Sequence, residues 1–198
     1  MMNRNMIIPA VLLAGMAITG CRPSPPVPKP RAYFKIDLPE HRYRQFDSTS
    51  FPFTFEFPVY GRISQDRDLI KEQHSPYWIN VDVPELDATI YLSYKAITPQ
   101  EPLDRLIDES YKLSYAHDIR ADYIKTPQFR TPNGLVGVYY YVGGNAASSY
   151  QFFITDEQKN FIRGSLYFNV TPNADSLKPA SDFMKKDMEH LVQTFRFK

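Results

Sequence analysis

The sequence lacks several features that usually indicate a function. It contains a single cysteine, Cys21, in 198 residues, which excludes an intrachain disulfide, cysteine-rich zinc sites and CxxC redox chemistry. Its 23 Lys and Arg residues are balanced by 22 Asp and Glu, and it has no run of five or more like charges. A nucleic-acid-binding surface and a polybasic membrane patch are therefore disfavoured. No GxSxG, HExxH, Walker or GxGxxG motif is present, which disfavours the enzyme classes with the best-defined motifs.

The four histidines also lack the spacing of a metal site. No two of His41, His74, His117 and His190 are two or four residues apart, so no local zinc signature exists, and we expect neither a metal nor a cofactor. His117 precedes Asp118 and could form half of a catalytic relay. It also falls near the end of a predicted helix, where a cation is favoured by the helix dipole, and we favour this structural role.

No apolar run is long enough for a transmembrane helix. The uncharged run over residues 6–18 has about 13 residues, where a membrane-spanning helix needs about 20. Arg4 before this run and small residues after it are typical of a secretory signal. Residues 18–21 (ITGC) resemble a bacterial lipobox, so we expect residues 1–20 to be removed and Cys21 to carry the lipid anchor. The alternative is an ordinary signal followed by a free thiol.

The lipid anchor is followed by a proline-rich segment. Residues 22–30 contain five prolines in nine residues, which predicts a semi-rigid polyproline II stalk over residues 21–30. Residues 31–198 are then a single periplasmic domain. Arg22 follows Cys21 with no acidic cluster after it, which favours a membrane-anchored position in the periplasm, on the inner leaflet of the outer membrane.

What the sequence has in abundance is aromatic residues, with 14 Phe, 14 Tyr and one Trp, a composition that favours β structure. The residues Phe51, Phe53, Phe55 and Phe57 alternate with polar residues and prolines, which predicts a core-facing edge strand. Similar alternation predicts about six or seven strands in all, at residues 51–57, 77–83, 86–94, 119–126, 136–142, 150–155 and 162–170. In the strand at 136–142, the even-numbered residues are predicted to face the core.

Two helices interrupt these strands. The first opens with a capping box at Thr98–Glu101 and extends to about residue 117, and the second covers about residues 178–194. Each helix has one apolar face, and the predicted elements do not follow a repeating β–α–β order. We therefore predict an α+β fold, in which an antiparallel sheet has two helices packed on one of its faces.

The least generic segment is Gly143–Ser149 (GGNAASS). Its glycines allow positive φ, and its small side chains let another backbone or a ligand approach; the alternative is a flexible hairpin loop. Neighbouring aromatic and polar residues have the phase opposite to the predicted core. These residues are Tyr139, Tyr141, Gln151, Phe153, Phe161, Arg163, Ser165 and Tyr167. If no helix covers them, they form an exposed aromatic and polar platform that suits a protein or glycan partner. If helices cover them, they form a second core. The partner-binding hypothesis comprises Gly143, Gly144, Asn145, Ser148, Ser149, Gln151, Arg163 and Tyr167.

Several segments together resemble a known family. They are residues 29–40 (KPRAYFKIDLPE), 51–58 (FPFTFEFP), 90–95 (IYLSYK), 143–152 (GGNAASSYQF) and 161–168 (FIRGSLYF). These segments resemble the gliding-motility lipoprotein GldD family. The resemblance implies a component of the envelope machinery for gliding and the associated type IX protein secretion. It also implies partners, namely other motility lipoproteins and a cytoplasmic-membrane protein. These motifs carry no known chemistry, so no catalytic residue is implied.

Together, these observations predict a non-enzymatic lipoprotein that supports the gliding and type IX secretion machinery through protein–protein contacts, with no nucleic-acid partner. The main alternative is a cell-wall or polysaccharide binding module that uses the aromatic platform around Tyr167 and Arg163. An envelope hydrolase is a further, less favoured alternative.

Overall fold

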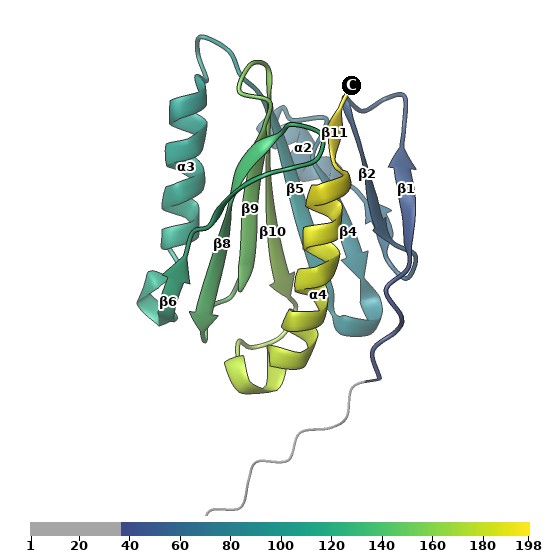
Figure 1. Cartoon of the computed structure of the whole chain (residues 1–198), viewed down its shortest axis with the longest axis vertical. Coiled ribbons are helices and arrows are strands. Elements are labelled where there is room, and N and C mark those ends of the chain that lie inside the picture. The colour runs from purple at the N-terminus through teal and green to yellow at the C-terminus, as the bar shows by residue number, and fades with distance from the viewer. Residues whose placement is uncertain (1–36) are drawn as a thin grey trace, which may run out of the picture. The chain divides into compact units, whose positions relative to one another are not determined.

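The larger of two antiparallel sheets forms the centre of the fold in the computed structural model, which describes residues 37–198 (Figure 1). Its strand order is β3 (Arg62–Ser64), β4 (Ile79–Val83), β5 (Ala88–Ala96), β10 (Asn160–Phe168), β9 (Tyr150–Thr155), β8 (Val136–Gly144) and β6 (Ala121–Lys125), and β7 (Gln128–Arg130) pairs with β8. All of these pairs are antiparallel. The predicted α+β class with an antiparallel sheet is therefore confirmed.

The smaller sheet contains the phenylalanine row. Its order is β1 (Tyr43–Asp47), β2 (Phe53–Pro58) and β11 (Arg196–Phe197). Phe53, Phe55 and Phe57 are buried in the core, and Phe51 packs against it, so the predicted core face is confirmed. The prediction of an edge strand is wrong, because β2 lies between β1 and β11. The prolines do not interrupt the strand, since one precedes it and the other ends it.

The main core lies between the large sheet and two covering elements, the small sheet and α4 (Ala174–Thr194) (Figure 1). The α4 side chains in this core include Met184, Met188 and Leu191. They share it with Phe152 of β9 and Ile162 of β10. Burial of this many large apolar side chains is the main stabilising contribution to the fold.

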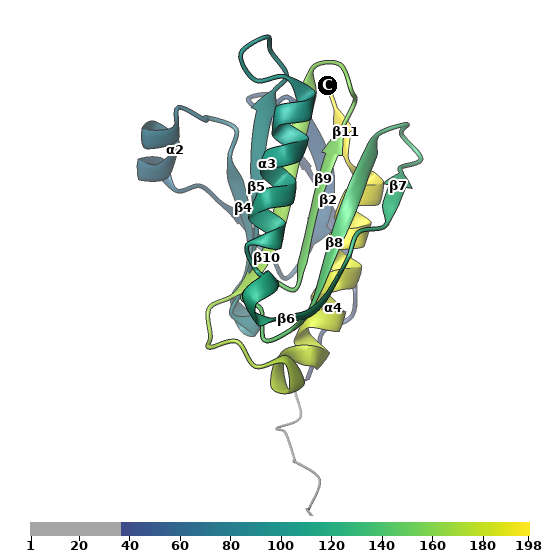
Figure 2. The same ribbon diagram turned by 90° about the vertical axis from the view of Figure 1, so that its left-hand side faces the viewer.

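The opposite face of the large sheet is covered in part by α3 (Leu103–Tyr115), and Figure 2 shows α3 in front of this sheet and α4 behind it. Leu106 of α3 packs with Tyr140, Phe153 and Phe161 in a second core cluster. Phe152 and Phe153 are consecutive in β9, so their side chains point to opposite faces. The helices therefore pack on opposite faces of the sheet, whereas the sequence predicted that both pack on one face.

The double covering of the sheet also corrects the predicted phase of β8. Tyr139 belongs to the main core and Tyr140 to the second core cluster. The sequence assigned the even-numbered residues of this strand to the main core, but they face α3. Alternation could not reveal this, because both phases of β8 and β9 are largely buried. The sequence left two alternatives for the residues of the opposite phase, an exposed platform or a second core. Phe153 and Phe161 are buried in a second core.

Helix α3 begins later than predicted. Thr98 Oγ1 accepts a hydrogen bond from the Glu101 backbone N–H at 3.1 Å, as in a capping box, but the helix starts only at Leu103. Pro102 follows Glu101, and a residue before proline is disfavoured in the helical conformation. Helix α4 begins earlier than predicted, at Ala174, because the Asn173 side chain accepts a hydrogen bond from Ser176 N.

The seven predicted strands are all found, and the structure adds shorter elements. The added elements are β1, β3, β7, β11, helix α2 (Arg67–Gln73) and the 3₁₀ turns η1 (Pro84–Leu86) and η2 (Asp118–Arg120). The predicted signal peptide over residues 1–20, the lipidated Cys21 and the stalk over residues 21–30 lie outside the described residues. Among residues 37–198, no helix is both long and apolar enough to span a membrane.

Candidate partner-binding site

The predicted loop connects β8 to β9, and its glycines have a local structural reason. Gly144 has φ of +96°, and a Cβ there would lie 2.7 Å from the Asp122 backbone nitrogen. A Cβ on Gly143 would collide with the ring of Tyr123. The two glycines therefore let β6 approach the end of β8, so another backbone does come close, as the small residues of this segment predicted.

Asn145 is exposed and fixes the loop to a helix. Its Oδ1 atom accepts a hydrogen bond at 2.8 Å from the backbone N–H of Ala174, the first residue of α4. The first N–H groups of a helix have no partner inside the helix, so this bond satisfies one of them. The loop is thus tied to α4 through Asn145.

Gln151 and Arg163 lie together on the α3 side of the sheet. Gln151 is fully buried, and its Oε1 atom accepts hydrogen bonds from Ser114 Oγ at 3.0 Å and from Arg163 Nη2. Arg163 Nη1 also donates to Ser165 Oγ at 3.2 Å. Burial lowers the pKa of the Arg163 guanidinium. Within residues 37–198, the ion pairs of the structure do not include Arg163.

This buried cluster has spare hydrogen-bonding capacity. In the part of the chain that the structure describes, Arg163 Nε, Gln151 Nε2 and Ser110 Oγ are buried without a hydrogen-bond partner. Ser148 is also buried, and its Oγ is in the same state. Such groups are costly to bury, and each is a place where a ligand, water or a rearrangement could supply the missing partner.

Tyr167 lies apart from the loop. Its ring is 5.7 Å from that of Tyr91 in an edge-to-face arrangement and 6.2 Å from that of His117. Burial first, and then the charge of Arg163, lower the pKa of His117. A neutral imidazole is therefore favoured at this position, in contrast to the cation that the helix dipole suggested.

The loop borders a hollow of about 450 Å³ at the end of α3. It is lined by Ala116, His117, Ile119, Arg120, Asn145, Ala146, Ala147 and Pro172. Ile119 lies in η2 with 94% of its surface exposed. The sequence pattern places Ile119 at the start of a strand, and the only local signal of its exposure is that it lies between two charged residues, Asp118 and Arg120.

The structure therefore divides the eight predicted site residues. Gly143, Gly144, Asn145, Ser148 and Ser149 belong to the loop and its borders. Gln151 and Arg163 form a contact beneath α3. Tyr167 lines a separate hollow on the same sheet.

A second polar cluster, around Asp187 of α4, had no signal in the sequence. Asp187 is fully buried, and its Oδ1 atom contacts His41 Nδ1 at 2.7 Å and accepts a hydrogen bond from Tyr43 OH at 3.0 Å. Its Oδ2 atom accepts a hydrogen bond from Tyr60 OH at 2.6 Å. Burial and the Asp187 carboxylate raise the pKa of both tyrosines. An activated nucleophile requires a lowered pKa, so these hydroxyls fit a structural role.

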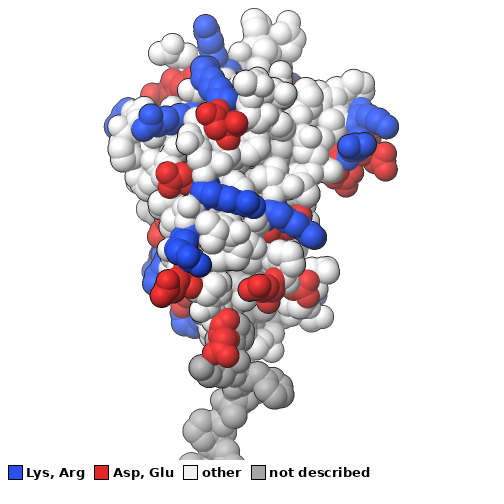
Figure 3. Space-filling model, turned by 90° about the vertical axis from the view of Figure 1, so that its right-hand side faces the viewer, with Lys and Arg blue, Asp and Glu red and all other residues white. Residues whose placement is uncertain are grey.

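Two further properties limit what the described surface can bind. Among residues 37–198, no group of three or more His, Cys, Asp or Glu side chains could hold a metal ion. Figure 3 shows Lys and Arg mixed with Asp and Glu on the face that includes β1, with no extended area of one sign. That face is therefore poorly suited to binding a polyanion.

Comparisons with known proteins show one family. Curated proteins give no match. A solved structure of cyanobacterial PsbP (CyanoP) from Synechocystis sp. PCC 6803 is similar over 81% of this chain and 95% of that chain, with 14% identity and a TM-score of 0.49, too low to support an argument. The family model described as gliding motility lipoprotein GldD matches residues 23–197. The chain therefore belongs to the gliding motility lipoprotein GldD family.

Proposed function

We propose that this lipoprotein supports the gliding motility and type IX protein secretion machinery through protein–protein contacts and without catalysis. The proposed partners are other envelope proteins of gliding and secretion, including lipoproteins and a cytoplasmic-membrane protein. The signal peptide over residues 1–20 directs export, and the acylated Cys21 anchors the chain in the periplasmic leaflet of the outer membrane. The proposed contact surface comprises the loop Gly143–Ser149 and the adjacent hollow at the end of α3.

One observation carries the proposed contact surface, the exposure of Ile119 beside a hollow lined in part by small apolar side chains, while the gliding role rests on the family. Burying an isoleucine side chain on contact with a partner would contribute roughly 1.5–3 kcal/mol. Polar side chains surround it, since Arg120 and Asn145 line the same hollow. An apolar side chain within a polar rim is the arrangement that protein interfaces use most often.

Site-specific photo-crosslinking in intact cells tests the surface directly. A photo-reactive residue at position 119 should give a discrete adduct with another envelope protein, which mass spectrometry identifies. Val59 is a matched control, because it is also apolar and exposed but follows β2 at another part of the domain. The same adducts at both positions, or none at position 119, would contradict the proposed surface.

A complementation experiment then separates contact from folding. Because the Ile119 side chain is almost fully exposed, Ile119→Ser should leave the thermal midpoint within about 1 °C, as expected of a surface substitution with little effect on stability. We expect the variant to be as abundant as the wild type and yet to lose gliding and secretion in a deletion strain. Val59→Ser should restore both activities. Loss of gliding alone would remove secretion from the proposal.

A further inference from the structure

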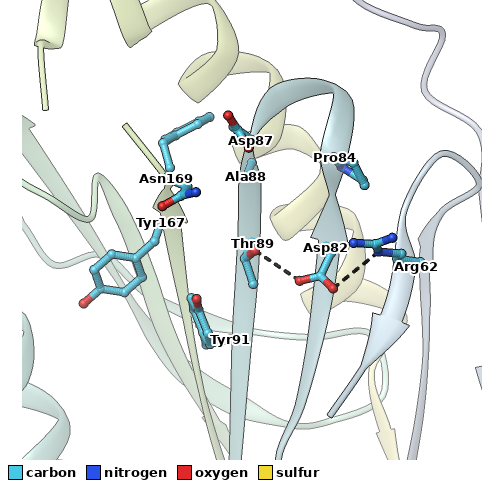
Figure 4. A pocket seen from close by; sticks show the side chains of 10 residues that line it. Arg62, Asp82, Pro84, Asp87, Ala88, Thr89, Tyr91, Tyr167 and Asn169 are labelled. Carbon is cyan, nitrogen blue, oxygen red and sulfur yellow. Dashed lines mark hydrogen bonds and ion pairs between the residues drawn. The ribbon is translucent and has the colours of Figure 1, made fainter. Parts of the chain in front are cut away.

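A second hollow, with a volume of about 770 Å³, lies over strands of the large sheet at a distance from α3 in the sheet order (Figure 4). It lies over β3, β4, β5 and β10, on the face opposite the main core. The lining residues are Arg62, Asp82, Pro84, Asp87, Ala88, Thr89, Tyr91, Tyr167, Phe168 and Asn169. Its volume is within the range of roughly 300–1,000 Å³ that small-molecule sites usually have.

The register of the sheet explains why these side chains meet. Arg62 pairs with Asp82, Asp82 with Thr89, and Thr89 with Tyr167, so four strands contribute one row of side chains across the sheet. Directly paired residues of antiparallel strands share a face. Tyr91 is two residues beyond Thr89 in β5 and therefore lies on the same face as this row.

The row has a polar side and an aromatic side, as Figure 4 shows. On the polar side, Asp82 accepts a hydrogen bond from Thr89 Oγ1 at 3.1 Å and lies 3.7 Å from Arg62 Nε. On the aromatic side, the rings of Tyr91 and Tyr167 are 5.7 Å apart with an interplanar angle of 79°. Tyr91 is 41% exposed, so its ring is accessible to a ligand.

These groups define the chemistry of a ligand. The tyrosine rings offer apolar surfaces to C–H groups, while the carboxylates, the hydroxyl and the amide offer hydrogen bonds to many hydroxyl groups. Two carboxylates, Asp82 and Asp87, and one guanidinium, Arg62, line the hollow, and this excess of negative charge disfavours an anionic ligand. A neutral sugar chain has both required features, since each ring carries C–H faces and a rim of hydroxyls.

We propose that the Tyr91–Tyr167 hollow is a binding site for a neutral glycan chain. The tyrosine rings pack against the C–H faces of the sugar units. Asp82, Thr89 and Asn169 hydrogen-bond to the hydroxyl groups along one edge. This site is separate from the Ile119 surface, so the inference does not depend on the proposed protein contacts.

Titration of the full-length chain with defined sugars tests the inference. The chain is purified in a detergent with a polyoxyethylene head group, because a sugar head group would compete for the site. The probes are tetra-N-acetylchitotetraose and maltotetraose, which are uncharged, and a hyaluronan tetrasaccharide, which carries carboxylates. Trp78 is the single tryptophan of the chain and lines a small hollow together with Tyr91, so its fluorescence reports binding nearby. Calorimetry provides an independent measurement.

We expect saturable binding of at least one uncharged tetrasaccharide, and at least tenfold weaker binding of the hyaluronan fragment. Tyr91→Ala should weaken binding at least tenfold. Arg62→Ala should weaken it several-fold, because it removes the ion-pair partner that orients the Asp82 carboxylate. It should not affect folding, because the Arg62 side chain is 71% exposed. Tyr111→Ala is the matched control, since Tyr111 is similarly exposed but lies on α3 and does not line the hollow.

Three results would overturn the inference. The first is the absence of saturable binding of both uncharged sugars at millimolar concentration. The second is an equal loss of binding in Tyr91→Ala and Tyr111→Ala when unfolding midpoints match that of the wild type. The third is tighter binding of the hyaluronan fragment than of both uncharged tetrasaccharides. If Tyr91→Ala fails to fold, unchanged binding in Arg62→Ala would count against the site.

Discussion

Each face of the large sheet has an ionisable side chain near its helix, and the two differ in burial and in partners: Asp187 is fully buried, whereas Arg163 is half-buried. On the α4 side, the two carboxylate oxygens of Asp187 are satisfied by His41, Tyr43 and Tyr60. On the α3 side, the side-chain hydrogen bonds of Arg163 go to neutral side chains, Gln151 and Ser165, and its Nε has no hydrogen-bond partner within the described chain. The carboxylate on the α4 side is therefore fully buried and fully hydrogen-bonded, whereas the guanidinium on the α3 side is half-buried and only partly compensated.

The difference assigns different roles to the two faces. The Asp187 cluster joins α4 to the chain before β1, to β1 itself and to the segment after β2, so it holds three separate parts of the sequence together. Stacking extends it, because Tyr43 lies 3.5 Å from the ring of His190, which contacts Glu56 at 2.6 Å. We expect the Arg163 cluster to stabilise the fold less than the Asp187 cluster does. The exposed Ile119 and the tyrosine hollow both lie on the same side of the molecule as Arg163. We therefore expect stability to depend on the α4 face and binding on the α3 face.

The largest expected effect is that of Asp187→Ala. Removing a fully buried carboxylate leaves His41, Tyr43 and Tyr60 with unmatched polar groups, which should cost about 3–5 kcal/mol of the free energy of unfolding. Urea denaturation measures this loss. The control is Asp182→Ala on the same helix, whose exposed pair with Lys178 should contribute less than about 1 kcal/mol. Equal losses in the two variants would remove the distinction between the faces.

The buried phenylalanine row of β2 provides a reference for the size of this loss of stability. Phe55→Ala should cost roughly 3–5 kcal/mol, because it removes a buried ring and leaves a cavity beside Phe195. Glu56→Ala should cost less than about 1 kcal/mol, since its pair with His190 is partly exposed. Matching losses in urea denaturation would show that the alternation of β2 has been misassigned.

A single hydroxyl of the Asp187 cluster should have an intermediate effect. Tyr60→Phe removes the 2.6 Å hydrogen bond to Oδ2 and should cost about 1.5–3 kcal/mol, the usual range for a bond to a charged group. Tyr150→Phe is the matched control, because its 3.2 Å bond to Asp182 is exposed and should contribute less. If Tyr60→Phe costs no more than Tyr150→Phe, the Asp187 cluster does not stabilise the fold as proposed.

Some of this arrangement could be predicted from the sequence, and the reason is local. The row from Phe53 to Phe57 faces one core only, so strict alternation revealed its buried face. Tyr139 and Tyr140 are both buried, because β8 is covered on two sides, and alternation then contains no signal. Asp187 follows two lysines, a pattern typical of an exposed helix face, and its partners lie 127 to 146 residues away in sequence.

In the candidate site, too, the sequence predicted the local backbone features but not those that depend on tertiary packing. The glycines of the loop predicted a special backbone, and Gly144 has positive φ. The burial of Gln151 depends on where α3 crosses the sheet, which no local pattern specifies. The same is true of the exposure of Ile119, because η2 turns its side chain away from the core that a strand would have faced.

The loop itself provides the next smaller effect. Asn145→Ala should cost about 0.5–2 kcal/mol, since it leaves the Ala174 N–H at the start of α4 without its side-chain acceptor. Asn145→Asp keeps an acceptor near the positive end of the helix dipole and should restore most of this stability. Thermal denaturation measures both variants. If the aspartate variant is as unstable as the alanine variant, the hydrogen bond to α4 is not what Asn145 contributes.

Arg163→Met should change stability by less than about 1 kcal/mol in either direction, since it removes two hydrogen bonds but also the cost of desolvating a half-buried guanidinium whose Nε has no partner within the described chain. The sequence-based hypothesis that Arg163 is part of the partner-binding site predicts that gliding and secretion nevertheless fail at normal protein abundance. Urea denaturation and complementation of a deletion strain measure the two effects separately. A loss of 3 kcal/mol or more would instead make Arg163 a structural counterpart of Asp187.

The smallest expected effect is a change in the titration of His117. Burial and the charge of Arg163 both lower its pKa in the folded protein, so the unfolded chain takes up a proton more readily. Stability should therefore fall as the pH drops through the unfolded value of about 6.5. Arg163→Met removes the charge but not the burial, so it should raise the pKa of His117 only in part and weaken this pH dependence.

NMR titration of the imidazole measures the shift, and Lys112→Met, which removes an exposed cation of α3, is the control. An unchanged His117 pKa in Arg163→Met would mean that the guanidinium is compensated by groups other than the neutral partners of the α3 face, and the contrast with Asp187 would no longer hold.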